Sequence, residues 1–120
     1  MKINKQFIYP KSMRSIVNGG RHYDIDGGKL PSVTTILSAT QSPEKKASLD
    51  AWKLKMGAKA ADEVRDTAAA RGTAMHTYLE HYLDGTGYKD LTTLGKQAET
   101  MANKIIESGL GDLEEIWGQE

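Results

Sequence analysis

Apolar residues recur at helical spacing over most of the chain after residue 40. A capping serine, a proline and an acid at positions 42–44 predict a helix start, and Gly57 predicts its end. A second apolar stripe runs from 58 to about 83, and a third runs from about 91 to 108 before another glycine. These segments predict a mainly helical chain with two long helices.

The first 30 residues have a different pattern, with short β-branched or aromatic runs between turn signals. Asn18-Gly19-Gly20 predicts a β-hairpin because Asn and Gly accept positive φ, and 26–28 predicts a second turn. Residues 33–37 have β-branched side chains typical of a strand, but Ser32 is a good N-cap and the apolar positions share one helical face. A short helix is therefore favoured there.

Leu113, Ile116 and Trp117 predict the start of a strand at the end of the chain. The expected fold class is α+β, mainly helical, with an N-terminal β-hairpin and a C-terminal strand start. A length of 120 residues suits one small domain, and we expect 1–30 to form the hairpin region, 31–110 the helical region and 111–120 the start of a core sheet.

Composition narrows the class of protein. Hydrophobic residues make up 38% and charged residues 27%, as in ordinary globular chains. No run approaches the roughly 20 apolar residues of a membrane span, and the start of the chain has no apolar signal-peptide core, so we expect a cytoplasmic protein without a membrane partner. The absence of cysteine excludes disulfides and thiolate metal sites.

The net charge is zero, but the charges are unevenly distributed. Residues 1–60 contain 11 Lys/Arg and four Asp/Glu, a balance of +7, whereas residues 61–120 contain five Lys/Arg and 12 Asp/Glu, a balance of −7. A basic first half could face a polyanion. Two solvated faces that happen to differ are an equally good interpretation.

The long middle helix has a glycine and a histidine on its apolar stripe. The stripe comprises Val64, Ala68, Gly72, His76, Leu79 and Leu83. Gly72 costs about 1 kcal/mol of helix stability relative to alanine, which suggests that another backbone, or a ligand, approaches the helix there.

His76 follows Gly72 by one helical turn. The ring could be an ordinary core residue, or it could bind a metal ion together with Glu80, four residues further on. Alternatively, Glu80 could orient the ring. His22 and His81 lack such a context and are expected to be surface residues.

The order of these motifs resembles a known family. The run "YDIDGGKLPSVTTILSAT", a Trp-containing helix, "RGTAMHTYLEHYL" and a final "EEIWGQE" resemble the N-terminal part of RecB-like exonucleases of the PD-(D/E)XK nuclease superfamily, including phage-encoded members and mitochondrial genome-maintenance relatives. The resemblance covers about residues 23 to 120. It implies an incomplete restriction-endonuclease-like fold, DNA as the partner and Mg²⁺ or Mn²⁺ as the cofactor.

The resemblance also implies roles for particular residues. His76 would face the catalytic metal, and Glu120 would be a catalytic and metal-binding glutamate on the first strand. The expected DNA contacts are Ser32, Thr34, Thr35, Arg71 and Thr73. A helix start at Ser32 suits phosphate because free N–H groups and a partial positive charge gather there.

The resemblance implies that the family's defining aspartate and the acid-x-lysine triplet that follows it would lie beyond residue 120. Hydrolysis of a phosphodiester by this chemistry needs those groups, so we expect this sequence to be an inactive fragment of a DNA exonuclease. The alternative is a non-catalytic helical module that binds DNA or protein. An unrelated metal-dependent hydrolase is disfavoured because no second cluster has metal-ligand spacing.

Overall fold

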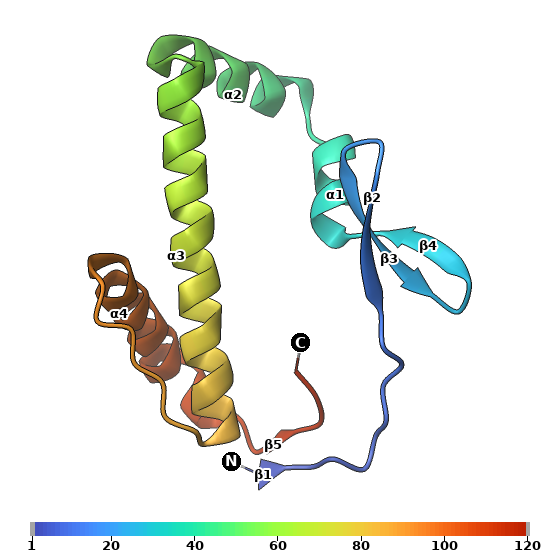
Figure 1. Cartoon of the computed structure of the whole chain (residues 1–120), viewed down its shortest axis with the longest axis vertical. Coiled ribbons are helices and arrows are strands. Elements are labelled where there is room, and N and C mark those ends of the chain that lie inside the picture. The colour runs from blue at the N-terminus through green and yellow to red at the C-terminus, as the bar shows by residue number, and fades with distance from the viewer. Residues whose placement is uncertain (1, 120) are drawn as a thin grey trace. The chain divides into compact units, whose positions relative to one another are not determined.

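The computed structural model describes residues 2–119, and its fold is α+β and mainly helical, as the sequence predicts (Figure 1). The strands are β1 (Lys2–Ile3), β2 (Met13–Val17), β3 (Gly20–Ile25), β4 (Gly28–Pro31) and β5 (Glu115–Ile116). The helices are α1 (Val33–Ala39), α2 (Pro43–Met56), α3 (Ala58–Asp84) and α4 (Thr93–Ser108), followed by a 3₁₀ turn, η1 (Leu110–Asp112). None of these described helices combines the length and the apolar character needed to cross a bilayer.

The chain divides into two compact units. Residues 8–57 form one of them, here named the sheet unit, which contains β2, β3, β4, α1 and α2. The residues up to Phe7 and those from Ala58 onwards form the other, here named the helical unit, which contains α3 and α4 with β1 and β5. Each unit is described by itself below.

The sheet unit contains a three-stranded antiparallel sheet in the order β2-β3-β4. The predicted hairpin is confirmed: Asn18 and Gly19 have φ values of 51° and 79°, and both lie in the left-handed region that a two-residue hairpin loop requires. Asp26 and Gly27 form a second such turn at 50° and 81°. This turn leads into β4, a four-residue exposed strand that the sequence analysis does not predict.

Side-chain caps fix where α1 and α2 begin. The Ser32 hydroxyl accepts a hydrogen bond from the Thr35 backbone N–H at 3.1 Å, and the Ser42 hydroxyl accepts one from Lys45 at 3.2 Å. Both predicted helix starts are therefore confirmed. Gly57, with φ of 85°, follows the last residue of α2, as predicted.

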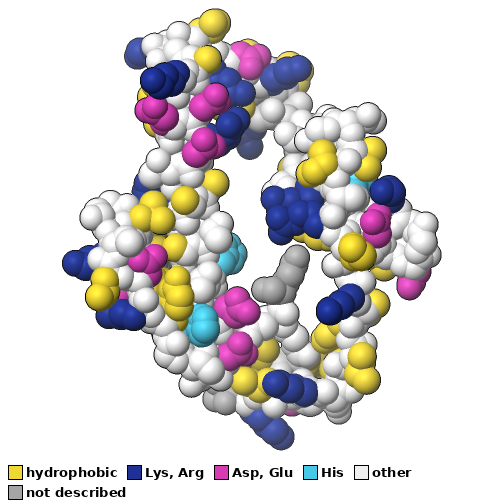
Figure 2. Space-filling model, viewed as in Figure 1, with side chains coloured by type: hydrophobic (Ala, Val, Ile, Leu, Met, Phe, Trp, Pro, Cys, Tyr) yellow, Lys and Arg dark blue, Asp and Glu magenta, His cyan; other side chains and the backbone are white. Residues whose placement is uncertain are grey.

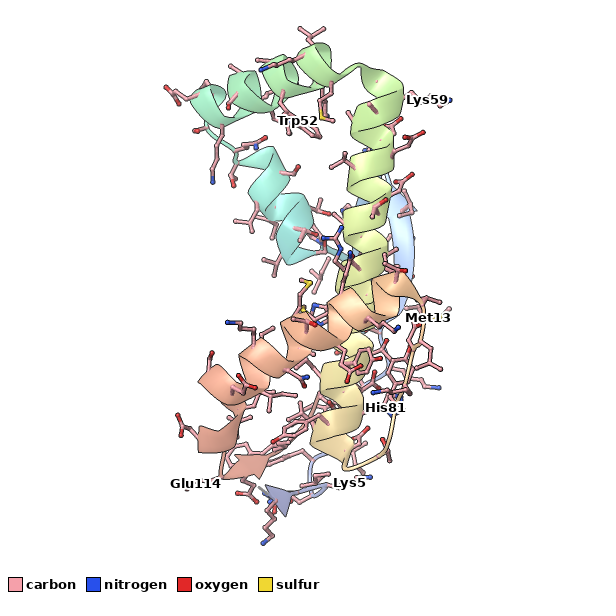
Figure 3. All side chains as sticks on the ribbon, turned by 90° about the vertical axis from the view of Figure 1, so that its left-hand side faces the viewer. Lys5, Met13, Trp52, Lys59, His81 and Glu114 are labelled. Atoms are coloured by element: carbon pink, nitrogen blue, oxygen red, sulfur yellow. The ribbon has the colours of Figure 1, made fainter. Side chains whose placement is uncertain are left out.

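The helical unit is built on the packing of α3 against α4. Ala98 and Ala102 of α4 are 0% and 1% exposed, and their small side chains allow the two helices to approach closely (Figure 3). The apolar stripe predicted over 91–108 also contains Met101 and Ile105. These two side chains are exposed, because the buried strip of α4 is narrow and consists of the small residues Gly95, Ala98 and Ala102.

The strand predicted at the end of the chain is present as β5. It pairs in parallel with β1, so that Ile116 lies beside Ile3. The backbone N–H of Asn4 also donates to the Ile116 carbonyl at 2.8 Å. The partner strand thus comes from the first residues of the chain.

Candidate functional site

His76 lies on α3 and its side chain is exposed. One turn earlier, a Cβ added to Gly72 would meet no described atom within 4 Å, so no neighbouring backbone packs against the glycine there. Glu80, which lies on the same face of α3 four residues further on, is exposed as well. The helix therefore presents an accessible imidazole and a carboxylate beside open space.

The predicted stripe on α3 is partly buried from Gly72 onwards, and His76 is the exposed exception there. Leu79 and Leu83 are half-buried, whereas Val64 and Ala68 are exposed. An apolar stripe predicts which side of a helix can be covered, but not which of its residues will be. Met75 and Thr77 on either side of His76 are half-buried, so His76 is an exposed position within a partly covered segment of α3.

The predicted metal partner Glu120 lies outside the described residues, so its position relative to His76 stays a prediction. Within residues 2–119, no three His, Asp or Glu side chains come together as a metal-binding group. His76 and Glu80 alone would give two of the six ligands that Mg²⁺ takes, and the others would have to come from further protein residues, substrate and water. The described residues do not complete the implied Mg²⁺ or Mn²⁺ site.

The predicted DNA contacts on α1 are largely occupied within the chain. Ser32 is buried, and its hydroxyl lies 2.8 Å from the Thr35 hydroxyl and 3.1 Å from that of Thr34. Thr35 Oγ1 donates to the Arg21 carbonyl at 2.9 Å. Ser32 and Thr35 therefore attach α1 to β3, while Thr34 is exposed. Their contact with DNA stays a prediction.

The other two predicted contacts lie on α3, in the helical unit. Thr73 is exposed. Arg71 is half-buried, and its Nε is a buried donor without a hydrogen-bond partner among the described atoms. A guanidinium with an unused N–H can donate to a phosphate oxygen, and the contact of Arg71 with DNA stays a prediction.

A polar clasp joins the loop before α4 to α3. The Asp90 backbone N–H donates to the Tyr78 hydroxyl at 2.8 Å, and this hydroxyl in turn donates to Glu99 at 3.5 Å. Asp90 accepts from the Thr92 hydroxyl at 2.7 Å and from the Thr92 N–H at 3.0 Å. These two bonds to Thr92 lower the pKa of Asp90 from its ordinary value. Lys89 pairs with Glu99 at 3.2 Å.

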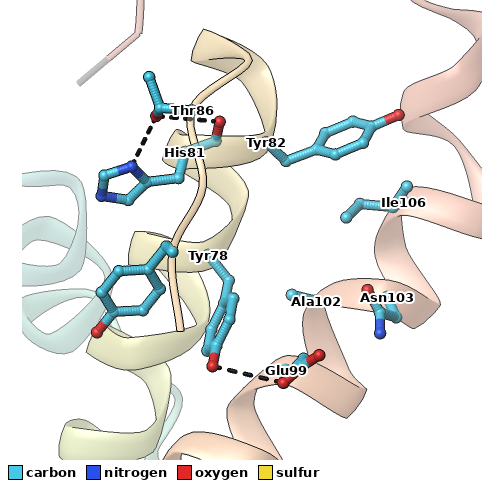
Figure 4. Close-up of a pocket in the computed structure, with 9 residues that line it drawn as sticks. Tyr78, His81, Tyr82, Thr86, Glu99, Ala102, Asn103 and Ile106 are labelled. Atoms are coloured by element: carbon cyan, nitrogen blue, oxygen red, sulfur yellow. Dashed lines mark hydrogen bonds between the residues drawn. The ribbon is translucent and has the colours of Figure 1, made fainter. Parts of the chain in front are cut away.

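A small open pocket of about 180 Å³ lies between α3 and α4 beside this clasp (Figure 4). Its lining includes Tyr78, His81 and Tyr82 from α3, and Glu99, Asn103 and Ile106 from α4. Aromatic rings and a carboxylate are suitable for a small polar or cationic group. However, the Glu99 carboxylate is already paired with Lys89.

His81 shows how this pocket wall is held. Its Nδ1 shares a 2.7 Å hydrogen bond with the Thr86 hydroxyl, and its ring stacks on Tyr88 at 5.0 Å with an interplanar angle of 6°. His22 and His81, expected at the surface, are half-buried, and His22 Nδ1 lies 3.1 Å from the Gly20 carbonyl oxygen. Gly20 lies two residues before His22 on β3, and Thr86 lies in the loop after α3, so helical spacing gives no signal for either partner.

The carboxylate of Glu115 on β5 is held by neighbours that the sequence analysis did not single out. The Trp117 side chain and the Asn4 amide both hydrogen-bond to it, the latter at 2.7 Å, and they lower the pKa of Glu115. Phe7 packs against Trp117 with 5.3 Å between ring centroids. These contacts fix the first residues of the chain to the strand that precedes Gln119.

Comparison with known proteins identifies no relative of this chain. The sequence matches no protein-family model, and neither a curated protein nor a solved structure matches it. The functional argument therefore depends on the residues and their geometry.

Proposed function

We propose that this chain contributes the histidine-bearing helix of a metal-dependent DNA exonuclease of the RecB-like PD-(D/E)XK type. The observation that carries the proposal is the exposed His76 one turn after Gly72, beside which a Cβ would meet no described atom. The "RGTAMHTYLEHYL" resemblance gives this arrangement a chemical meaning. We also propose that the protein acts in the cytoplasm.

In this proposal the chain supplies part of the catalytic centre. His76 would offer a neutral imidazole nitrogen to a divalent cation, and Glu80 would accept a hydrogen bond from the ring or bind the same ion. Mg²⁺ or Mn²⁺, when bound, would polarise the scissile phosphodiester and lower the pKa of a bound water. The resemblance places the catalytic aspartate of the superfamily, and the acid-x-lysine triplet after it, beyond residue 120, so the proposal requires them from outside this segment.

The test uses protein expressed from the complete open reading frame that contains these residues. His76→Ala should reduce Mg²⁺-dependent release of nucleotides from labelled DNA by roughly 100-fold or more, since removing even an outer-shell partner of a metal ligand costs roughly 10–100-fold. Its affinity for DNA in EDTA should stay within about threefold of wild type. Asp66→Ala, which removes another exposed side chain of α3, is the matched control and should keep full activity.

Two results would contradict the proposal. One is full activity of His76→Ala. The other is a wild-type protein that degrades no DNA with either Mg²⁺ or Mn²⁺. Circular dichroism of the variant separates loss of chemistry from loss of folding, and the exposure of His76 leads us to expect a wild-type spectrum.

A second candidate is a non-catalytic module that binds DNA or protein. The sheet unit favours it, because residues 8–57 contain eight Lys/Arg and four Asp/Glu together with exposed apolar side chains. A module that contacts phosphates would lose affinity steeply with salt and would not need Mg²⁺. DNA binding with that salt dependence and without any cleavage would favour this candidate over the nuclease.

A further inference from the structure

The two faces of the β2-β3-β4 sheet have different surroundings. Helix α1 lies against the face that contains Gly20, since a Cβ added to Gly20 would come within 3.0 Å of the Thr35 methyl group. Side chains alternate between faces along a strand, so Arg21 and Tyr23 point to the opposite side. This opposite side is named the open face here, and it comprises Arg14, Ile16, Arg21, Tyr23, Ile25 and Leu30.

Strand register gathers two arginines around a tyrosine on the open face. Arg14 is directly across from Tyr23, which is in turn across from Leu30 on β4. Arg21 precedes Tyr23 by two residues and is across from Ile16. Cβ atoms of such cross-strand pairs are about 4.5–5.5 Å apart, so these five side chains form one continuous surface.

The open face is basic and it is not neutralised. It carries no acidic residue, and neither Arg14 nor Arg21 forms an ion pair with a carboxylate in the part of the chain that the structure describes. Both arginines are exposed. Figure 2 shows both Lys or Arg and Asp or Glu side chains over the elements of the sheet unit, and the strand register places the acidic Asp24 on the face opposite to Arg21 and Tyr23. The charge of this face is therefore complementary to a polyanion.

The face is also apolar, which narrows the class of polyanion. Ile16 is 67% exposed and Leu30 is 53% exposed, and Tyr23 between them is half-buried. A DNA duplex presents phosphates outside and keeps the faces of its bases stacked within. An unpaired strand presents phosphates and base faces together, and proteins bind such strands by combining cationic side chains with aromatic rings.

We propose that the open face binds single-stranded DNA, with Arg14 and Arg21 contacting phosphates and Tyr23 contacting a base. The inference rests on the proposed function, in that DNA is taken as the partner. It goes further in assigning the surface, the strandedness and three residues, none of which belongs to the predicted contacts on α1 and α3.

The experiment measures binding of a fluorescein-labelled oligothymidine by anisotropy at several salt concentrations in EDTA. Arg14→Ala/Arg21→Ala should weaken binding by at least tenfold, and the slope of log K against log salt should become shallower by about 1.4, since each phosphate contact to a single strand contributes about 0.7. Lys53→Ala/Lys55→Ala on α2 removes the same charge from the same unit and should change affinity by less than threefold. If the double alanine variant fails to fold, Arg14→Gln/Arg21→Gln is measured in its place, with the same result expected.

Tyr23→Leu tests the base contact separately. It keeps an apolar side chain in the sheet but removes the ring, so it should weaken binding about fivefold or more without changing the salt slope. An unchanged affinity of Tyr23→Leu would overturn the assignment of a base to this residue.

Failure of the inference is distinguishable from failure of the proposed function. Wild-type protein that degrades DNA, but whose single-strand binding survives in both arginine variants, overturns the open face and leaves the nuclease intact. Equal loss of duplex and single-strand binding overturns the strandedness. If the arginine variants lose binding to phosphatidylserine vesicles but keep binding to oligothymidine, the face binds a membrane and the inference is overturned.

Discussion

Replacing Gly72 with alanine tests whether the space beside α3 is as open as the structure shows. Gly72 lies within the 27-residue helix, and its φ is not among the positive values of the described backbone. The added methyl group would meet no described atom within 4 Å outside the helix's own backbone. The substitution should therefore realise the whole helix-propensity difference between Gly and Ala, about 1 kcal/mol of added stability.

The assay is thermal and urea unfolding followed by circular dichroism at 222 nm. For a unit of 60–100 residues, 1 kcal/mol corresponds to roughly 4–8 °C in Tm, which is easily resolved. Gly95→Ala is the matched opposite case, because its Cβ would lie 2.5 Å from the backbone oxygen of Asp90, which cannot move away freely. That variant should lose about 1–3 kcal/mol through overpacking.

A destabilised Gly72→Ala protein would refute the reasoning, since it would mean that another part of the chain packs against this glycine. The nuclease proposal adds a second expectation for the same variant. If the space admits DNA or a metal ligand, Gly72→Ala should be more stable but less active than wild type. Higher Tm with unchanged cleavage would show that the ligand does not use this space.

Three smaller perturbations test the local physics. Thr92→Ala removes the hydroxyl that accepts from Gly95 N–H at 3.0 Å, and urea unfolding should show a loss of about 1 kcal/mol. The pKa of Asp90 is lowered in the folded state, so its carboxylate stabilises the fold at pH values above the ordinary pKa of 3.8. This contribution is lost as the pH falls through the lowered pKa. The difference in unfolding free energy between wild type and Asp90→Asn should therefore shrink when unfolding is measured in acid. Asn4→Ala should raise the pKa of Glu115 towards its ordinary value in an NMR titration, and an unmoved pKa would argue against this bond.

Local signals in the sequence predict most of the secondary structure. Asn18-Gly19, Ser42-Pro43 and Gly57 each act through a backbone preference that does not depend on distant residues, so the hairpin and α2 are found correctly. β4 is missed because its four residues include a glycine and a proline and are all exposed, which leaves no alternation to recognise.

Long-range features are less predictable. The pairing of β5 with β1 joins residues more than 110 positions apart, and no local pattern identifies that partner. The exposure of His76 has the same origin. Helical spacing places the ring on an apolar stripe, but which side of α3 packs against α4 is decided by long-range contacts.

The roles expected of the candidate site residues stay predictions, and the structure shows which of them are exposed. The exposed positions of His76 and Thr73 agree with roles in ligand binding, whereas the hydroxyls of Ser32 and Thr35 serve α1 itself. The same residue types, such as serine and threonine, occur both as helix caps and as phosphate contacts, because both roles use polar groups at a helix start. Only the geometry separates the two roles.

The most direct measurement of the central claim is an aromatic ¹H–¹³C NMR spectrum of the three histidines during titration with Mn²⁺, using protein from the complete open reading frame. The account predicts that the ring signals of His76 broaden first and at the lowest Mn²⁺ concentration, while those of His22 and His81, which are bonded to Gly20 and Thr86, stay sharp. Broadening of all three rings together, or a His76 signal that stays sharp at Mn²⁺ concentrations that support DNA cleavage, would contradict it.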